Sequence, residues 1–454
     1  MPALVTMRSV PLFWLLICAG LMEALLLILH WLGDLRYRAP ETIGLMLLTS
    51  LLYLVSCHLI LGGRRKENLN GFSQLTLLVI GVSILFRITV WPLAPALSDD
   101  VYRYRWEGQV QAAGGNPYQA RPNDPEWAGL RDEAFPRVVG KDFKAGYGPF
   151  VMLLERWTFQ AVSAFTANPE QQAFWFKTPA AVFDIAVLLA LWALLAAHGL
   201  PAERVLIYGW SPLAVMEFWG TGHNDTVAIT FILLALLAAK RERWTWAFAA
   251  LTMAACSKLW PLALFPIFVG ARGWRPVRWH QWWVAIPITG LLVLPFWSNI
   301  EENARFMTGF IGGWRNNDSL FGLLLWLFGD PSGAKRAAMV IVALTVILVT
   351  LRRLPLERAC LVAIAVMLLV SANCHPWYLS WFLPLLAFAP VFGLLLWTAL
   401  MPIAYQVLID WVASGEWRGS TPWRWLIYVP VFAALAAGGI RRLRRQRLNP
   451  AQRG

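Results

Sequence analysis

The stretch IGLMLLTSLLYLVSCHLILGGRRK, residues 43–66, joins a mostly apolar run (43–61) to the basic cluster Arg64, Arg65 and Lys66. An apolar run of about 20 residues is long enough to cross the hydrocarbon core of a bilayer as a helix. Lys and Arg accumulate in short loops on the cytoplasmic side, so the cluster marks the inner end of this crossing. The stretch therefore predicts a membrane-spanning helix with a defined direction.

The composition of the whole chain fits the same class. Of 454 residues, 58% are hydrophobic and 14% are charged, whereas soluble domains carry about 25% charged residues. The net charge of +13 comes from basic clusters between apolar stretches, which we interpret as inner-face loops rather than as a nucleic-acid site. We expect an all-α polytopic membrane protein, a single integral-membrane domain over 1–454, with about 12–14 transmembrane helices and both ends inside.

Three polar segments are expected outside the bundle. Residues 94–166 form a large outer-face loop with amphipathic helices, and its part 94–146 is nearly neutral, with eight acidic and seven basic residues. A second outer-face loop is expected at 298–335, and residues 441–454 form a basic cytoplasmic tail. Within the bundle, the apolar run 244–270 lies between two basic clusters. We expect it to consist of two half-spans that meet at a proline break near Lys258.

Polar residues of unusual type fall at the outer ends of the expected spans. Asp99 and Asp100 open the large loop and begin a helix that we expect to lie on the membrane surface, although the helix dipole alone also favours acids there. His223, Asn224 and Asp225 form a turn between two spans, where helix capping by Asp225 is the simpler alternative. Further aromatic, amide and charged residues suited to a sugar or a phosphate complete the set: Tyr102, Trp106, Tyr147, Lys258, Trp314, Arg315, Asn316, His375, Trp377 and Tyr378.

Ionisable residues also occur inside the expected spans, where they usually face the bundle interior and pair with one another. Arg87 and Glu217 lie near the outer ends of their spans and are further candidates for the site. Glu23 and Asp184 are expected to be structural. Lys258, at the helix break, could bind a phosphate, with snorkelling to the surface as the alternative.

The order of these motifs resembles the GT-C superfamily of integral-membrane glycosyltransferases, and most of all the polyprenol-phosphate-mannose-dependent mannosyltransferases of bacteria. The resemblance extends over residues 95–390 and is carried by the acidic pair, Asn116-Pro117-Tyr118, Tyr147-Gly148-Pro149, the Gly-His-Asn-Asp turn, Lys258 and His375-Pro376-Trp377-Tyr378. Two features depart from the family pattern. The acids are adjacent rather than arranged Asp-x-Asp, and three spans precede the loop where many relatives have one.

The resemblance implies an inverting transfer of a hexose, mannose in the first place, from a polyprenyl-phosphate donor to an acceptor hydroxyl. It places the reaction at the outer face of the bacterial inner membrane, toward the periplasm. Asp99 or Asp100 is the implied catalytic base, and the sequence leaves open which. A carboxylate can take the acceptor proton, and a cation can stabilise the departing phosphate. Lys258 is the first candidate for that cation and Arg315 the second.

Cofactor and partner expectations follow from the same chemistry. The sequence requires no cofactor, and a divalent cation (Mg²⁺ or Mn²⁺) on Asp99 and Asp100 is the alternative source of positive charge. The expected partners are the lipid-linked donor, membrane lipid and a glycan, lipid or protein acceptor, with no nucleic acid. The alternative function is a transporter or flippase for a polyprenyl-linked glycan. Transporters favour internal repeats and midplane sites, whereas these polar residues lie at the outer ends of spans.

Overall fold

The computed structural model describes residues 12–62, 73–272, 281–298, 315–419 and 421–448. These residues fold into helices, and the one β pairing within them is an isolated bridge between Asn316 and Asn373. The expected all-α class is confirmed.

The elements up to the middle of the chain are α1 (Leu12–Trp31), α2 (Ala39–Gly62), α3 (Gln74–Val90), α4 (Asp100–Ala112), η1 (Pro125–Leu130), η2 (Phe135–Arg137), α5 (Pro149–Ser163), α6 (Pro169–Trp175), α7 (Thr178–Ala197), η3 (Ala202–Val205), α8 (Leu206–Gly209), α9 (Pro212–Val215), the π-helical turn η4 (Met216–Gly220) and α10 (Asp225–Lys240). The elements after it are α11 (Trp244–Ala255), η5 (Trp260–Leu264), α12 (Phe265–Ala271), α13 (Ala285–Val293), η7 (Leu294–Phe296), α15 (Leu320–Phe328), α16 (Pro331–Leu351), α17 (Leu356–Leu369), η8 (Pro376–Trp381), η9 (Leu383–Ala387), α18 (Phe392–Leu400), η10 (Met401–Gln406), α19 (Val407–Ser414) and α20 (Arg424–Leu448).

Within the described residues, six helical stretches are long and apolar enough to cross a membrane, and three apolar helical stretches are shorter. The six are Leu12–Trp31, Ala39–Gly62, Pro169–Ala197, Pro331–Leu351, Phe392–Ser414 and Arg424–Arg444. A polytopic membrane protein is thus confirmed, but fewer full-length helices are present than expected. Residues 203–219, for example, form a mostly apolar stretch of the length of a span, but they are divided into η3, α8, α9 and η4, because Pro212 and the π-helical turn interrupt the helix.

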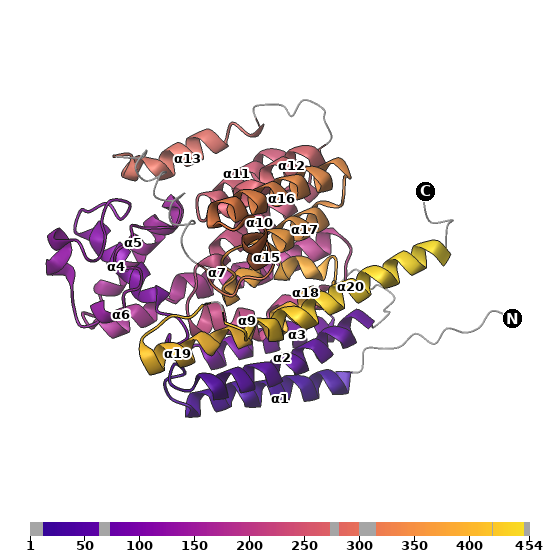
Figure 1. The fold of residues 1–454 in the computed structure, drawn as a ribbon, viewed down its shortest axis with the longest axis horizontal. Coiled ribbons are helices and arrows are strands. Elements are labelled where there is room, and N and C mark those ends of the chain that lie inside the picture. Colours follow the sequence, from indigo (N-terminus) through magenta and orange to yellow (C-terminus); the bar gives the residue numbers. More distant parts are fainter. Residues whose placement is uncertain (1–11, 63–72, 273–280, 299–314, 420, 449–454) are drawn as a thin grey trace.

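The bundle has two distinct ends (Figure 1). Helices α1–α3 lie side by side, and α4, α5 and α6 form a separate body beyond one end of the bundle, on the left of the view. The start of α1 and the end of α20 lie at the opposite end, on the right of the view. The large apolar core occupies the bundle, whereas α4–α6 enclose a smaller core around Trp106.

Helix α4 is not the surface helix that its sequence suggested. Its residues from Val101 to Gly108 are all buried, as are Val110 and Gln111. Its charged side chains are satisfied internally: Arg103 donates to Glu107 at 2.7 Å, and Arg105 donates to Asp132 at 2.6 Å. Because such pairs remove the cost of burying polar groups, a helix that is polar on several sides can lie inside the α4–α6 body. The helix itself agrees with the prediction, and it ends at Ala112, shortly before Gly114 at φ +87°.

The expected break in 244–270 is present. Helix α11 ends at Ala255, and helical geometry resumes only at Trp260 with the Pro261 turn η5. Lys258 therefore lies in a short non-helical segment, buried between two apolar helical segments.

Candidate functional site

The two acids at the start of α4 have different surroundings. Asp99 faces two guanidinium groups: its Oδ1 lies 2.8 Å from Arg36 and 2.7 Å from Arg137. Asp100 is one residue further along the chain and instead approaches His223, whose Nδ1 lies 3.4 Å from its Oδ2. Asp99 thus connects the α1–α2 loop to the outer body, while Asp100 faces the bundle.

His223 lies between two carboxylates. On the side opposite Asp100, its Nε2 lies 3.4 Å from Oε2 of Glu217, which also accepts a hydrogen bond from Tyr405. Glu217 reaches this position from the π-helical turn η4, and turns of this type are frequent at functional sites. The following Gly222 has φ +81°, and a Cβ there would lie 2.8 Å from Lys177. Residue 222 must therefore be glycine, and its backbone conformation turns the chain so that His223 approaches Asp100.

A second pair of charges lies beside the first. Lys258 Nζ is 2.7 Å from Oδ1 of Asp225, the first residue of α10, and Trp381 Nε1 donates to the same oxygen at 2.5 Å. Both charged side chains are buried, with 9% and 0% exposed. The ammonium also lies 5.0 Å from the centre of the Tyr147 ring and 5.8 Å from that of Tyr378, where aromatic faces attract a cation.

The Tyr147-Gly148-Pro149 motif couples the outer loop to the helix break. The N–H of Gly148 donates to Ser257 O at 2.9 Å, and the N–H of Phe150 donates to Cys256 O at 3.0 Å. A Cβ at Gly148 would lie 2.1 Å from the Cys256 carbonyl oxygen, so this close approach requires glycine. Tyr147 then reaches Tyr104, with their hydroxyl oxygens 3.2 Å apart, and Tyr104 donates to Asp100 at 3.3 Å. The Asp100 and Lys258 pairs are thereby joined.

An aromatic stack forms one wall of the group. The ring of Trp377 is parallel to both imidazoles, with its centre 3.6 Å from that of His223 and 4.5 Å from that of His375. Asn316 Nδ2 lies 3.1 Å from Nδ1 of His375 and fixes its orientation. We call Asp100, Tyr147, Glu217, His223, Asp225, Lys258, His375, Trp377 and Tyr378 the acid–base cluster.

Burial and charged neighbours shift the pKa values of Asp99, Asp100 and His375 in different directions. Burial raises the pKa of the Asp100 carboxyl, but His223, His375 and Lys258 outweigh that effect, and the pKa lies below its ordinary value. Burial raises the pKa of Asp99 above its ordinary value in spite of Arg137 and Arg36. Burial also lowers the pKa of His375 to about 4. At neutral pH, Asp100 is thus an ionised carboxylate next to a neutral His375.

Within the described residues, several buried polar atoms of the acid–base cluster and of the adjacent Asn224 have no hydrogen-bond partner. Both amide atoms of Asn224 and Oδ2 of Asp225 are among them. Neither ring nitrogen of His223 meets hydrogen-bond geometry, although both lie at ion-pair distance from a carboxylate. Buried polar groups usually have a hydrogen-bond partner, so these atoms are available to bond a substrate or a water molecule. The arrangement offers an ionised carboxylate, a nearby ammonium and aromatic faces, which together suit proton removal beside an anionic group.

Three predicted residues lie away from the acid–base cluster, and a fourth is not among the described residues. Tyr102 donates to Glu170 at 2.6 Å and packs under Arg137, on the Asp99 side of α4. Trp106 belongs to the small α4–α6 core. Arg315 is paired with Asp318 at 2.9 Å, and Trp314 lies outside the described residues.

Four ionisable residues were expected inside membrane spans: Glu23, Arg87, Asp184 and Glu217. Only Glu217 joins the acid–base cluster. Arg87 forms a fully buried pair with Asp184 at 2.5 Å instead, and Glu23 accepts a hydrogen bond from Thr89 at 2.5 Å. The structural role expected for Asp184 and Glu23 agrees with these contacts.

Sequence reasoning missed three residues that contact the acid–base cluster. Tyr104 lies one helical turn after Asp100, so the i, i+4 spacing was a usable signal. Trp381 and Tyr405 are 156 and 188 residues from the acids they contact, and no local pattern connects them.

Comparison with known proteins provides one match. Residues 12–273 match the family model described as alpha-(1->6)-mannopyranosyltransferase, N-terminal domain. No curated protein and no solved structure matches the chain.

Proposed function

The chain belongs to this mannosyltransferase family, and from that premise we propose that it transfers mannose, with inversion, from a polyprenyl-phosphate donor to an acceptor hydroxyl at the outer face of the membrane. The observation that carries the proposal is the placement of Asp100. It is an ionised carboxylate that neighbours Lys258 and the two histidines without being neutralised by an arginine. The acceptor is a glycan, a lipid or a protein.

Asp100 is the general base of the proposed reaction. As the acceptor oxygen attacks the anomeric carbon, its proton passes to the Asp100 carboxylate. The bond between the anomeric carbon and the phosphate oxygen breaks at the same time, and its electron pair leaves with the lipid phosphate. Because attack and departure occur on opposite faces of the sugar, the configuration inverts, and the transition state resembles an oxocarbenium ion. Asp99 is a positioning residue, since both its guanidinium partners hold the start of α4.

Lys258 stabilises the departing phosphate. One of its N–H groups is directed to Asp225, and an ammonium has three donors, so two remain for phosphate oxygens. The contact with Asp225 holds the ammonium at the helix break, beside Tyr147 and Tyr378. Arg315 is less suitable because Asp318 already binds it. Asn224, His375 and Trp377 remain to contact the sugar.

The donor atoms of the acidic pair do not fit a divalent cation well. Asp99 already faces two guanidinium groups, and Asp100 faces an imidazole. In the part of the chain that the structure describes, no group of three or more His, Cys, Asp or Glu residues is placed to bind a metal. In the proposed mechanism, Lys258 rather than a metal ion therefore supplies the positive charge that stabilises the departing phosphate.

The different charges at the two ends of the bundle support the outer-face assignment. Asp225 begins α10 and Lys240 ends it, so they are separated by about 22 Å along the helix axis. The Lys240 end also carries Arg241, Arg243, Arg352 and Arg353, whose accumulation is typical of the cytoplasmic side. With that end on the cytoplasmic side, the acid–base cluster faces the periplasmic side of a bacterial inner membrane. Sugar transfer there needs no nucleotide, because the lipid-linked donor is already activated.

The test uses purified protein in detergent with polyprenyl phosphate carrying labelled mannose and a panel of acceptors. We expect labelled product whose new linkage has the opposite anomeric configuration to the donor, as read by NMR. We expect Asp100→Asn to reduce kcat by about 10²–10⁴-fold, while Asp99→Asn keeps most of the activity. Retention of configuration, or full activity of Asp100→Asn, would contradict the proposal.

A further inference from the structure

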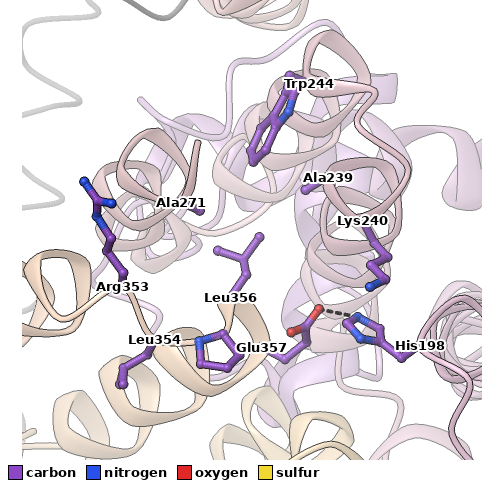
Figure 2. Close-up of a pocket in the computed structure, with 10 residues that line it drawn as sticks. His198, Ala239, Lys240, Trp244, Ala271, Arg353, Leu354, Leu356 and Glu357 are labelled. Atoms are coloured by element: carbon purple, nitrogen blue, oxygen red, sulfur yellow. Dashed lines mark hydrogen bonds and ion pairs between the residues drawn. The ribbon is translucent and has the colours of Figure 1, made fainter. Parts of the chain in front are cut away.

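A cavity lies at the end of the bundle opposite the acid–base cluster (Figure 2). It has a volume of about 290 Å³ and is lined by the ends of α7, α10 and α12, by Trp244 at the start of α11 and by the α16–α17 turn. A second cavity of about 560 Å³ is lined by Trp192, Ala193, Ala196 and Ala197 of α7, together with Lys240 and Arg241. Lys240 lines both, so the two cavities adjoin. We call them together the basic cavity.

The charges that line the basic cavity are unbalanced. Lys240, Arg241 and Arg353 supply three cations, and no hydrogen bond or ion pair of their side chains occurs within the described part of the chain. The one carboxylate in the lining, Glu357, is bound to His198 at 2.7 Å. In Figure 2 the Lys240 side chain extends toward this pair. The nearby Glu242 accepts a hydrogen bond from the Trp244 indole. The basic cavity therefore offers an anion a positively charged lining.

The rest of the lining is apolar and continues onto an exposed apolar surface. Leu189, which is 59% exposed, precedes Ala193 and Ala196 by four and seven residues and so shares their face of α7. Leu234, also exposed, precedes Arg241 by seven residues on α10. Small alanine side chains leave a channel beside α7, while Trp192 and Trp244 are of the type that lies at the membrane–water interface.

We propose that the basic cavity binds an anionic membrane phospholipid, with its phosphodiester group at Lys240 and Arg241 and an acyl chain along the alanine face of α7. Basic pockets between membrane helices bind phosphorylated lipid head groups by the same principle. A phosphate without a chain would use the cations but leave the alanine channel open. The continuity of cationic lining and apolar channel is what favours a lipid. This site is independent of the proposed sugar transfer, because it lies at the other end of α10.

The experiment measures binding of phosphatidylglycerol to delipidated full-length protein by native mass spectrometry, with phosphatidylcholine for comparison. We expect the double variant Lys240→Gln/Arg241→Gln to weaken phosphatidylglycerol binding about thirtyfold, since each basic residue near an anionic lipid contributes about fivefold. The matched control is Arg243→Gln, which removes one exposed charge from the same end without lining either cavity, and it should leave binding nearly unchanged.

A second arm distinguishes a lipid from a free phosphate. Ala196→Leu fills the channel without changing charge, and we expect it to weaken phosphatidylglycerol binding. Inorganic phosphate at millimolar concentration should not displace the lipid from the wild type. Equal binding by the wild type and the double variant would overturn the proposal. So would displacement by inorganic phosphate alone, which would identify a free-anion site.

Discussion

The two ends of α10 differ in how their charges are satisfied. At the Asp225 end, the buried acids and bases face one another: Asp225 pairs with Lys258, and His223 lies between Asp100 and Glu217. At the Lys240 end, the cations lie at the surface of a cavity, without partners among the described residues. Burying charges is costly unless they are paired, and intramembrane ionisable residues mark functional sites. The comparison indicates chemistry at the first end and a lipid contact at the second.

The largest combined effect on turnover and stability is expected from removing the buried ammonium. Lys258→Met should reduce kcat about 10²–10³-fold, as loss of one transition-state donor does. It should also lower stability by about 3–5 kcal/mol, because Asp225 is left buried without its partner. Steady-state kinetics and thermal unfolding in detergent measure the two effects separately.

The double variant Lys258→Met/Asp225→Asn separates the two roles of this lysine. Neutralising both partners should recover most of the stability but none of the turnover. Recovery of turnover together with stability would mean that the ammonium serves only to hold Asp225.

The next effect tests the contact between the outer loop and the helix break. Gly148→Ala places a Cβ 2.1 Å from the Cys256 carbonyl oxygen and should displace Tyr147 from Lys258. A shift of about 1 Å at a catalytic site can cost about a hundredfold in rate, and we expect a loss of that order in kcat. Gly129→Ala, in the same loop but with no atom within 4 Å of its Cβ, is the matched control and should behave as wild type. Unchanged turnover in Gly148→Ala would argue against any role of Tyr147.

The smallest effect is the pH dependence of stability. His375 is neutral in the fold, with its pKa lowered by burial to about 4, whereas an unfolded histidine has a pKa of about 6.5. The unfolded chain therefore takes up a proton first, and stability is lost as the pH falls from about 6.5 to about 4, by up to about 3 kcal/mol. Thermal unfolding across this range measures it. His375→Gln should flatten the curve, and an unchanged slope would show that other groups cause it.

Much of the fold was predictable because membrane crossing leaves a strong sequence signal. The lengths of the apolar runs and the positions of the basic clusters predicted the all-α class. Pro261 and the basic clusters on both sides of 244–270 predicted the helix break at Lys258. Helix α4 was placed wrongly on the membrane surface, because its polar residues bind partners such as Asp132, distant in the sequence, that no periodicity reveals. Residues 203–219 form several short helical pieces rather than one span, because Pro212 and the π-helical turn Met216–Gly220 interrupt the helix.

The candidate site was predictable as a set of motifs but not as a geometry. The turn at His223, the helix break at Lys258 and the segment at His375 do come together. The sequence could not distinguish Asp99 from Asp100, because their difference arises from Arg36 and Arg137. Tyr102 and Trp106 were included because they share the helix of the acids, yet they point into the outer body.

The most direct test compares one change at each end of α10 in a single assay. Transfer of labelled mannose from polyprenyl phosphate is measured for Asp100→Asn and for Lys240→Gln/Arg241→Gln, both reconstituted in the same lipid. We expect a loss of about 10²–10⁴-fold in kcat for the first variant, and wild-type turnover for the second. Wild-type turnover by Asp100→Asn, together with loss of turnover in the cavity variant, would contradict this expectation and place the chemistry at the other end of the helix.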